Sequence, residues 1–476
     1  MRAPTFRSAF TRRQVLVGAA ALATGALLPL PLGAAERSYT LRAAPGRALL
    51  LGDGNPATGV WAYGGKVPGP VIRARQGERL RVRVENGLAQ ETTVHWHGLR
   101  VPNAMDLVPG LTQKAIAPGA SFDYAFDLPD AGTYWYHPHA NGAEQVGRGL
   151  YGALIVEEKD PPRVDRDLLW VLDDWRLQQD AAIRADFGAF MDMSHGGRLG
   201  NIVTINGKPP ADLAVRTGER LRLRLVNVAN ARIFALNFGT LRPIVLTLDG
   251  QPVAPHEAPG GRVMLGPGQR ADIVVDMTGK PGDVAALRDD YYDRWAYQLL
   301  SLRYGAVPLR DTPLPPPAAL AGNPVAEPKL AGARRERIVF GGGMMGRMGG
   351  ARLDGRNVSL QEMMRQGLGW AVNGVVGRGH NPPPVLSLAR GQDCILELVN
   401  DTAWPHPIHL HGHFFRVLSR NGAPTPHREW ADTVLLAPSA RAEVAFVADN
   451  PGGWMFHCHI LEHQVGGMQA VIHVAA

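Results

Sequence analysis

The chain has 476 residues, which leaves room for about three domains of roughly 150 residues each. Its 56 glycines, 38 prolines and few long helical patterns favour many short strands joined by turns. The formal net charge is +7, but residues 1–35 carry four arginines and no acidic residue, so that 46 basic and 43 acidic residues remain beyond them, a net charge of +3. This small excess, without any basic run, argues against nucleic acid as a partner.

Residues 1–35 have the features of an export signal. Arg12 and Arg13 form a twin-arginine motif, an apolar stretch runs from Val15 to Leu32, and small residues at 33–35 precede Glu36. We therefore predict a signal peptide over 1–35 that the twin-arginine export machinery recognises and that is then removed. The expected product is a periplasmic protein without a stable membrane anchor. The alternative is an uncleaved anchor, which the length of the stretch would just permit.

The segment 36–160 contains two His-x-His pairs, His95/His97 and His137/His139. On an extended strand both histidines of such a pair point to the same face. Residues 68–98 align without a gap with residues 382–412, and residues 117–139 align in the same way with residues 437–459. A repeat of this length indicates copied structural units.

A third copy lies in the segment 161–311, where residues 209–239 follow the same pattern. In this copy Leu236 and Phe238 stand where the other two copies have histidine, so we expect a spacer without metal ligands. The alternation from Leu221 to Leu225 predicts a strand with one buried face. Residues 312–334 are rich in proline and alanine and are interpreted as a linker.

The segment 335–476 repeats the paired histidines as His409/His411 and His457/His459. A lone His-x-His pair is a weak sign of a metal site, but four pairs at matching repeat positions are a strong one. If the first and third units pack face to face, eight imidazoles converge between them. The chain has only two cysteines; Cys394 lies in an apolar strand pattern and is predicted to be a buried small hydrophobe.

Cys458 stands between His457 and His459, at the position that Pro138 fills in the first unit. On a strand its thiol points away from the two flanking imidazoles, so the sulfur faces one site and the imidazoles face another. His463 and Met468 follow within a short loop. A cysteine, two histidines and a weak axial methionine form the ligand set of an electron-transfer copper centre, and the second histidine must come from elsewhere in the chain.

The motifs HWHG, HPH, HPIHLHGH and HCHILEHxxxxM together resemble the multicopper oxidases of the laccase and cuprous-oxidase type. The resemblance covers essentially the whole mature chain. It implies an all-β fold with three cupredoxin-like Greek-key β-sandwich domains in tandem, at 36–160, 161–311 and 335–476. It also implies four copper ions, namely one type 1, one type 2 and a type 3 pair. The implied type 1 ligands are His406, Cys458 and His463 with axial Met468, the type 2 ligands are His95 and His409, and the type 3 ligands are His97, His137, His139, His411, His457 and His459.

The function implied by the resemblance couples one-electron oxidation of a small donor to four-electron reduction of O2 to water. Electrons would enter at Cys458 and pass through the adjacent backbone to His457 and His459. Asp106, nine residues after His97, matches the acid that relays protons in the family; the alternative is a surface loop carboxylate. Cuprous-oxidase relatives carry a second acid directly after the last type 1 histidine, where this chain has Gln464, which weakens the case for a second proton route.

The expected donor is either a phenol-like compound or Cu(I). Cuprous oxidases carry a methionine-rich insert early in the third domain, and thioethers suit Cu(I). In that place this chain has Met344, Met345, Met348, Met363 and Met364, which could equally be a glycine-rich loop followed by a helix with ordinary buried methionines. Thr402 and Trp404 replace an Asp and a Met of those relatives, which weakens the Cu(I) case. The segment 191–195 (MDMSH) is predicted to be a loop rather than a site. The remaining histidines are predicted to be structural or solvent-facing, namely His195, His256, His380, His413, His427 and His473.

Two alternatives belong to other classes of protein. A nitrite-reductase-like cupredoxin protein usually has two such domains and lacks a complete trinuclear site, whereas three units and eight paired histidines are present here. A copper-binding, non-enzymatic homologue would have lost ligands that this chain retains. The sequence therefore favours an oxidase, and we expect it to be a monomer.

Overall fold

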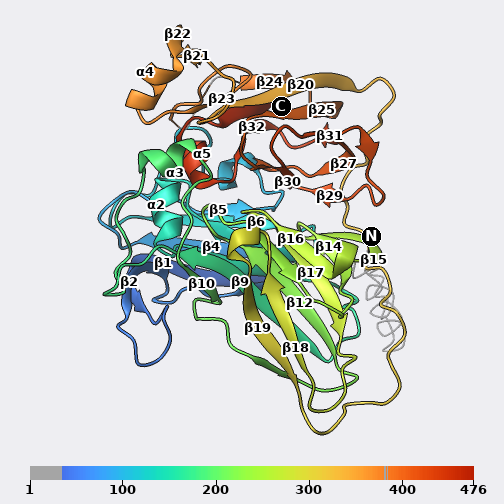
Figure 1. Ribbon diagram of the computed structural model, residues 1–476. Coiled ribbons are helices and arrows are strands. Elements are labelled where there is room, and N and C mark those ends of the chain that lie inside the picture. The colour runs from blue at the N-terminus through green and yellow to red at the C-terminus, as the bar shows by residue number, and fades with distance from the viewer. Residues whose placement is uncertain (1–34, 380–381, 383) are drawn as a thin grey trace, which may run out of the picture. The chain divides into compact units, whose positions relative to one another are not determined.

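The structure is a computed structural model that describes residues 35–379, 382 and 384–476. The predicted signal peptide, apart from its last residue, and His380 lie outside the described residues. The all-β prediction is confirmed: the described chain consists mainly of strands, and its α-helices are no longer than six residues (Figure 1). None of these helices is long and apolar enough to cross a membrane.

The first group of strands forms two four-stranded sheets, with orders β2-β1-β4-β6 and β3-β8-β7-β5. Side chains from both sheets, among them Val82 and Leu154, share one buried core, so the two sheets form a sandwich, which we call the first sandwich. Its elements are β1 (Glu36–Ala48), β2 (Thr58–Tyr63), β3 (Ile72–Arg75), β4 (Arg79–Asn86), β5 (His95–His97), η1 (Asn103–Met105), β6 (Ser121–Asp127), β7 (Gly132–His137), α2 (Gly142–Gly147) and β8 (Gly152–Glu157).

The second sandwich has sheets of six and five strands, with orders β10-β9-β12-β17-β14-β15 and β11-β19-β18-β13-β16, around a second core. Its elements are β9 (Arg166–Trp175), α3 (Phe190–Ser194), β10 (Ile202–Ile205), β11 (Leu213–Val215), β12 (Arg220–Asn227), β13 (Phe234–Asn237), β14 (Ile244–Leu248), β15 (Gln251–Glu257), η2 (Pro259–Gly261), β16 (Arg262–Leu265), β17 (Arg270–Asp276), β18 (Val284–Asp289), η3 (Asp293–Trp295) and β19 (Tyr297–Tyr304).

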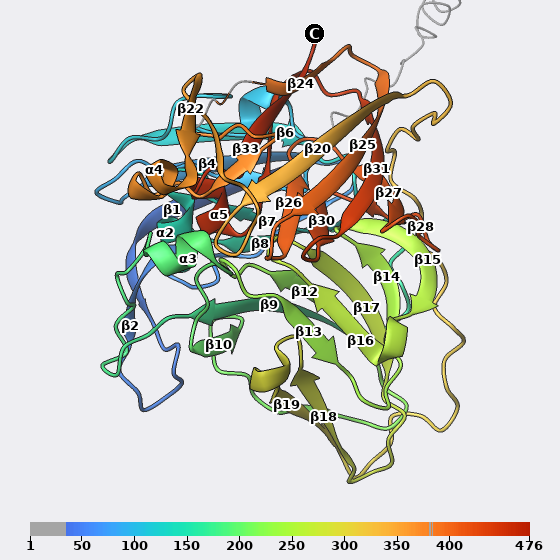
Figure 2. The same cartoon turned by 45° about the horizontal axis from the view of Figure 1, so that its top comes forward.

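The third sandwich packs a sheet containing β23-β20-β25-β31-β27-β28 against a sheet of order β24-β33-β32-β26-β30 (Figure 2). Cys394 is fully buried in its core, as the sequence predicts. Its elements are β20 (Arg334–Gly342), β21 (Gly350–Leu353), β22 (Arg356–Ser359), α4 (Leu360–Arg365), β23 (Trp370–Val372), β24 (Pro384–Leu388), β25 (Gln392–Asp401), β26 (His406–Leu410), β27 (Phe415–Arg420), β28 (Ala423–Pro424), β29 (Trp430–Ala431), β30 (Thr433–Leu436), β31 (Arg441–Ala448), β32 (Gly452–Cys458), α5 (Leu461–Val465) and β33 (Gln469–Val474).

The three sandwiches repeat one topology. The first strand of each runs parallel to a later one in the same sheet, as β1 with β4, β9 with β12 and β20 with β25. A second parallel pair recurs in the opposite sheet, as β3 with β8, β11 with β19 and β24 with β33. The repeat seen in the sequence is therefore a repeat of strand order as well.

One expectation for the second sandwich is wrong. The alternating pattern predicts that β12 has one solvated face, but every residue of this strand is buried. Arg222 pairs with the buried carboxylate of Asp272 at 2.6 Å, and Arg224 donates to Thr133 Oγ1 of the first sandwich at 3.0 Å. The charged face of β12 is thus covered by another sandwich and by carboxylates, an arrangement that alternation alone cannot distinguish from solvation.

Candidate metal centres

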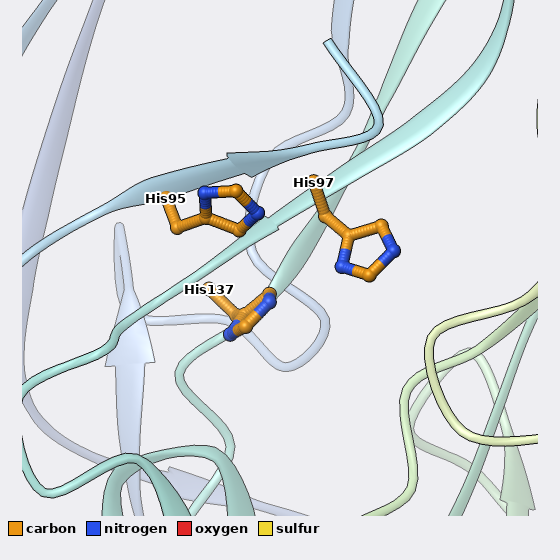
Figure 3. A group of neighbouring side chains, drawn as sticks. All are labelled: His95, His97 and His137. Carbon is orange, nitrogen blue, oxygen red and sulfur yellow. The ribbon is translucent and has the colours of Figure 1, made fainter. Parts of the chain in front are cut away.

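Strand pairing places the histidine pairs of each sandwich side by side. In the first sandwich His95 of β5 lies opposite His137 of β7, and in the third sandwich His409 of β26 lies opposite His457 of β32. Figure 3 shows the rings of His95, His97 and His137 close together, from two neighbouring strands. The two copies thus use the same register to present their imidazoles.

The two sets of histidines meet between the first and third sandwiches. The rings of His95 and His411 stack with centroids 3.8 Å apart, and those of His97 and His409 stack at the same distance. Nε2 of His411 and Nε2 of His457 lie 3.1 Å apart. All eight rings are buried, with exposed fractions of 3% or less. The structure therefore brings together every paired histidine identified in the sequence.

In four of the eight rings, one nitrogen is held by a protein oxygen while the other has no protein partner. Nδ1 of His137 donates to the carbonyl oxygen of Pro138 at 3.1 Å, for example, while its Nε2 is buried without a partner. A buried polar atom that lacks a hydrogen bond is costly, and several such atoms in one place indicate a missing ligand. The buried nitrogens without a protein partner in this cluster are His95 Nε2, His97 Nδ1, His137 Nε2, His139 Nε2, His409 Nε2, and both ring nitrogens of His459.

Burial also affects the protonation of most of these rings. Desolvation lowers the pKa of His97, His137 and His139 well below the ordinary histidine value, and the neighbouring imidazoles lower it further. The pKa of His411, His457 and His459 is lowered well below that value for the same reason. Neutral imidazoles are the form that binds metal ions.

Asp106 is fully buried beside this cluster, so the surface alternative is wrong for it. It follows η1, and its Oδ1 accepts a hydrogen bond from Nδ1 of His95 at 2.9 Å. Its Oδ2 accepts from Nδ1 of His411, also at 2.9 Å. One carboxylate therefore orients a histidine of the first sandwich and a histidine of the third.

A second acid, which no sequence motif marks, lies at the cluster. Asp432 is buried, and its Oδ1 accepts from Nε2 of His97 at 3.1 Å. Burial alone would raise the pKa of this carboxyl, but Arg270 and His409 more than offset that effect and hold it below the ordinary value. No motif marks Asp432, because its partners come from three sandwiches and meet only in the folded chain.

The thiol of Cys458 faces a separate buried site. Its Sγ lies 3.4 Å from Nδ1 of His406 and 3.7 Å from Nδ1 of His463. The other nitrogens of these two rings have oxygen partners, Thr402 Oγ1 for His406 at 2.8 Å and the carbonyl of His195 for His463 at 2.6 Å. Both Nδ1 atoms therefore point toward the sulfur.

Met468 is also part of this neighbourhood. It is fully buried in the core that contains Cys458, and its backbone amide donates to the carbonyl of His463 at 2.9 Å. The backbone amide of Cys458 donates in turn to the carbonyl of Met468 at 3.0 Å. A thiol, two imidazoles and a nearby thioether are a donor set that suits copper, so the residues present fit such an ion.

The two sites are joined by adjacent residues of one strand. Cys458 faces the site that it forms with His406 and His463, and its neighbour His457 faces the histidine cluster. Nδ1 of His457 donates to the carbonyl oxygen of Cys458 at 2.8 Å. The sulfur and the cluster are therefore linked by a few covalent bonds and by one hydrogen bond.

The segment 191–195, predicted to be a loop, lies largely in helix α3, next to the Cys458 site. The carbonyl of Met193 accepts from Trp370 Nε1 at 2.6 Å, and the ring of Trp370 lies 4.3 Å from that of His463. The amide of Met344 donates to the carbonyl of Ser194 at 2.8 Å. Methionine-bearing segments of the second and third sandwiches thus meet above His463.

The methionines of the predicted cluster differ in their exposure to solvent. Met344 and Met345 are 37% and 70% exposed beside that site, and Met191 of α3 is 59% exposed. Met363 is fully buried with Leu353 in a small core of its own. The prediction of an ordinary buried methionine therefore holds for Met363 but not for the exposed pair.

Other residues singled out in the sequence have varied surroundings. Gln464 is buried, with Nε2 3.5 Å from Nδ1 of His139. His413 is buried in the third sandwich, and the rings of His256 and His427 stack on each other at 3.6 Å. His473 is exposed.

The chain matches family models for multicopper oxidases at residues 49–161, 166–291 and 356–476. Multicopper oxidase MmcO of Mycobacterium tuberculosis is 31% identical over 87% of this chain and 83% of that protein. A crystal structure of a multicopper oxidase from Pseudomonas thermotolerans is 36% identical, covers 93% of this chain and all of that one, and superposes with a TM-score of 0.81. Laccase-1 of Botryotinia fuckeliana is 28% identical over 85% of this chain and 77% of that protein.

These matches agree with the repeated sandwiches and with the two buried donor sets, and they confirm the resemblance seen in the histidine and cysteine motifs. The chain belongs to the multicopper oxidase family, copper-dependent oxidoreductases that use O2 as electron acceptor.

Proposed function

We propose that this protein is a laccase-like enzyme with four copper ions, in which the oxidation of four donor molecules reduces one O2, with four protons, to two waters. The observation that carries the proposal is the set of buried, unpartnered histidine nitrogens facing one space, beside a buried thiol site one residue away. This arrangement argues against the nitrite-reductase-like and non-enzymatic alternatives.

In this proposal His406, Cys458 and His463 would hold the type 1 copper, with Met468 as a fourth, weaker ligand. His95 and His409 hold the type 2 copper. The type 3 pair is held by His97, His137, His139, His411, His457 and His459. Copper bound at these positions would supply the redox chemistry, namely one-electron oxidation of the donor and four-electron reduction of O2.

The protein's own residues perform the remaining tasks. Cys458 and His457 provide the electron path, because the carbonyl of Cys458 accepts a hydrogen bond from the ring of His457. Asp106 is the proposed proton relay, since its carboxylate lies within hydrogen-bond distance of His95 and His411 and is buried at the cluster. The surrounding burial keeps bulk water away from the reacting oxygen.

The donor is proposed to be a phenol-like compound or Cu(I), taken up near His463. The exposed thioethers of Met344 and Met345 support Cu(I), because soft ligands prefer that ion. The similarity to Laccase-1 of Botryotinia fuckeliana supports a phenolic donor by analogy. In either case the donor meets the surface above His463, because the imidazole itself is fully buried.

Further parts of the proposal concern the whole chain. The domains are 36–160, 161–311 and 335–476, with a linker at 312–334. Residues 1–35 direct export through the twin-arginine machinery, and the mature protein is a periplasmic monomer. Side chains of the linker support its place as a fixed connection, since Asn323 bonds Ala131 of the first sandwich and Gln251 of the second.

The test is the stoichiometry of the copper-loaded protein. Consumption of O2 and oxidation of a phenol or of Cu(I) are followed together, and the proposal expects four donor electrons per O2 without released hydrogen peroxide. Accumulation of peroxide, or the absence of O2 uptake with both donors at full copper loading, would refute it.

A further inference from the structure

Asp432, which lies between β29 and β30, contacts two histidines of the cluster. Its Oδ1 accepts from Nε2 of His97 at 3.1 Å and lies 3.3 Å from Nδ1 of His409. Its backbone carbonyl accepts from Nδ1 of His409 at 2.9 Å. His97 is thus held as the Nε2–H tautomer and His409 as the Nδ1–H tautomer.

The two remaining nitrogens are the ones without a protein partner. His97 Nδ1 and His409 Nε2 are buried and unpartnered. The two rings therefore offer different nitrogens to the cluster, although they stack on each other at 3.8 Å. The carboxylate and the backbone carbonyl of Asp432 favour this difference, together with the hydroxyl of Thr433, which donates to Oδ1 of Asp432 at 2.7 Å and lies 3.3 Å from Nε2 of His97 and 3.1 Å from Nδ1 of His409.

Arg270 of β17 fixes Asp432 in turn. Its Nη1 donates to Oδ1 of Asp432 at 2.9 Å and its Nη2 donates to Oδ2 at 2.6 Å, a two-pronged pairing in which each oxygen is held. The guanidinium is fully buried and also donates to the carbonyls of Asp249 at 2.8 Å and Thr133 at 3.3 Å. Neither partner can turn away without breaking several bonds.

Gly98 leaves the space that this arrangement needs. It follows His97 directly, has φ +85°, and a Cβ at this position would collide with the guanidinium of Arg270 and with Asp432. A side chain there would displace the pair that orients the neighbouring histidine. The glycine of the HWHG motif is thus explained by a residue of another sandwich.

We propose that Asp432 and Arg270 are positioning residues, which determine the ring nitrogens that His97 and His409 present to copper. The inference rests on the proposed ligand roles of these two histidines. His97 comes from the first sandwich, Arg270 from the second, and Asp432 and His409 from the third. The second sandwich, expected to be only a spacer, therefore supplies the cation that completes the site.

The test replaces Asp432 by Asn, which has nearly the same shape. The amide keeps one oxygen for Arg270 but presents an NH2 group to His97 Nε2. That donor favours the tautomer with a proton on Nδ1, the nitrogen that must face the metal. We expect the copper outside the type 1 site to be lost to a chelator at a concentration about 10- to 100-fold lower than in the wild type. The blue absorption of the type 1 site should be retained.

Asp272→Asn is the matched control. Asp272 is also fully buried, pairs with arginines of the same sheet and accepts from Thr133 of the first sandwich, but it has no hydrogen bond or ion pair with a histidine among the residues that the structure describes. We expect this variant to have a lower melting temperature but to retain its copper. Copper per protein, the electron paramagnetic resonance spectrum of type 2 Cu(II) and the melting temperature are measured for all proteins.

Arg270→Lys provides a second variant, because it keeps the charge but loses the two-pronged pairing. We expect an altered type 2 spectrum and copper retention between those of the wild type and Asp432→Asn. If Asp432→Asn does not fold, Arg270→Lys decides. Wild-type copper retention and spectrum in the folded variants would overturn the inference, as would copper loss in Asp272→Asn equal to that in Asp432→Asn. If the wild type itself holds no copper outside the type 1 site, the proposed function fails instead.

Discussion

At the scale of single residues, Cys458 has two roles, one through its thiol and one through its backbone carbonyl. Burial raises the pKa of its thiol, so that only a positive partner such as a metal ion would make the thiolate stable there. Its backbone carbonyl meanwhile bonds His457. The residue is therefore both a ligand position and the start of a path to the cluster.

Cys458→Ser is predicted to abolish the blue absorption and the oxidation of every donor. A hydroxyl is a poor copper ligand and cannot replace the thiolate. Visible spectra, donor oxidation and copper content check this, and about one copper per chain should be lost. Cys394→Ser, a substitution at the other cysteine, serves as the control and should remain blue. Donor oxidation that survives in Cys458→Ser would contradict the type 1 assignment.

Asp106→Asn is predicted to lower kcat by about 100-fold, because an amide cannot relay a proton. Copper content is measured alongside, since the same carboxylate orients His95 and His411. Adding Gln464→Glu should restore part of the activity, because position 464 lies beside His139 on another side of the cluster. A fully loaded Asp106→Asn protein with wild-type kcat would show that the relay lies elsewhere.

At the scale of structural elements, the sequence pattern predicted those features that depend only on residues close together in the chain. The histidine pairs and the face of Cys458 follow from the alternation of side chains along β5, β26 and β32. The buried arginines of β12 and the contact of α3 with the Cys458 site did not follow, because another sandwich provides their partners. Asp106 could be named from the resemblance, but only the fold shows that it is buried.

Met344 and Met345, in the loop after β20, are exposed, whereas Met363 in helix α4 is buried. This difference leads to a prediction about the donor. Replacing Met344 and Met345 together by Leu keeps the apolar volume but removes the thioethers. We expect KM for Cu(I) to rise several-fold while phenol oxidation stays unchanged. Steady-state kinetics with both donors check this, and Met363→Leu in the buried core is the matched control. Equal effects on the two donors would reject a Cu(I) role for the pair.

At the scale of the whole described chain, the histidine cluster makes the stability of the copper-free protein sensitive to acid. Desolvation lowers the pKa of most of its rings in the folded state, whereas unfolded histidines titrate near 6.5. Below about pH 6.5 the unfolded chain therefore binds more protons, and the free energy of unfolding falls. For each such ring the free energy of unfolding falls by up to about 1.4 kcal/mol per pH unit.

We therefore predict that the melting temperature of the copper-free protein falls as the pH is lowered from about 7.5 to 5. The copper-loaded protein should lose at least as much, because a nitrogen bound to metal takes up no proton in the folded state and protons compete with copper for that nitrogen as the pH falls. Thermal melts of both forms across this range check the prediction. His473→Gln, at an exposed position, should leave both profiles unchanged. A melting temperature of the copper-free protein that does not fall over this range, or a copper-loaded form that loses clearly less, would contradict the prediction.

The cluster is built from strands β5 and β7 of the first sandwich and β26 and β32 of the third, which are separated by the entire second sandwich. A ribosome makes these strands in that order, so the histidines of β5 and β7 are synthesised well before their partners in the third sandwich. A nascent chain cannot close the cluster around copper until β32 has been made. Copper insertion is therefore a late event in the life of this protein, after translation has reached the final sandwich.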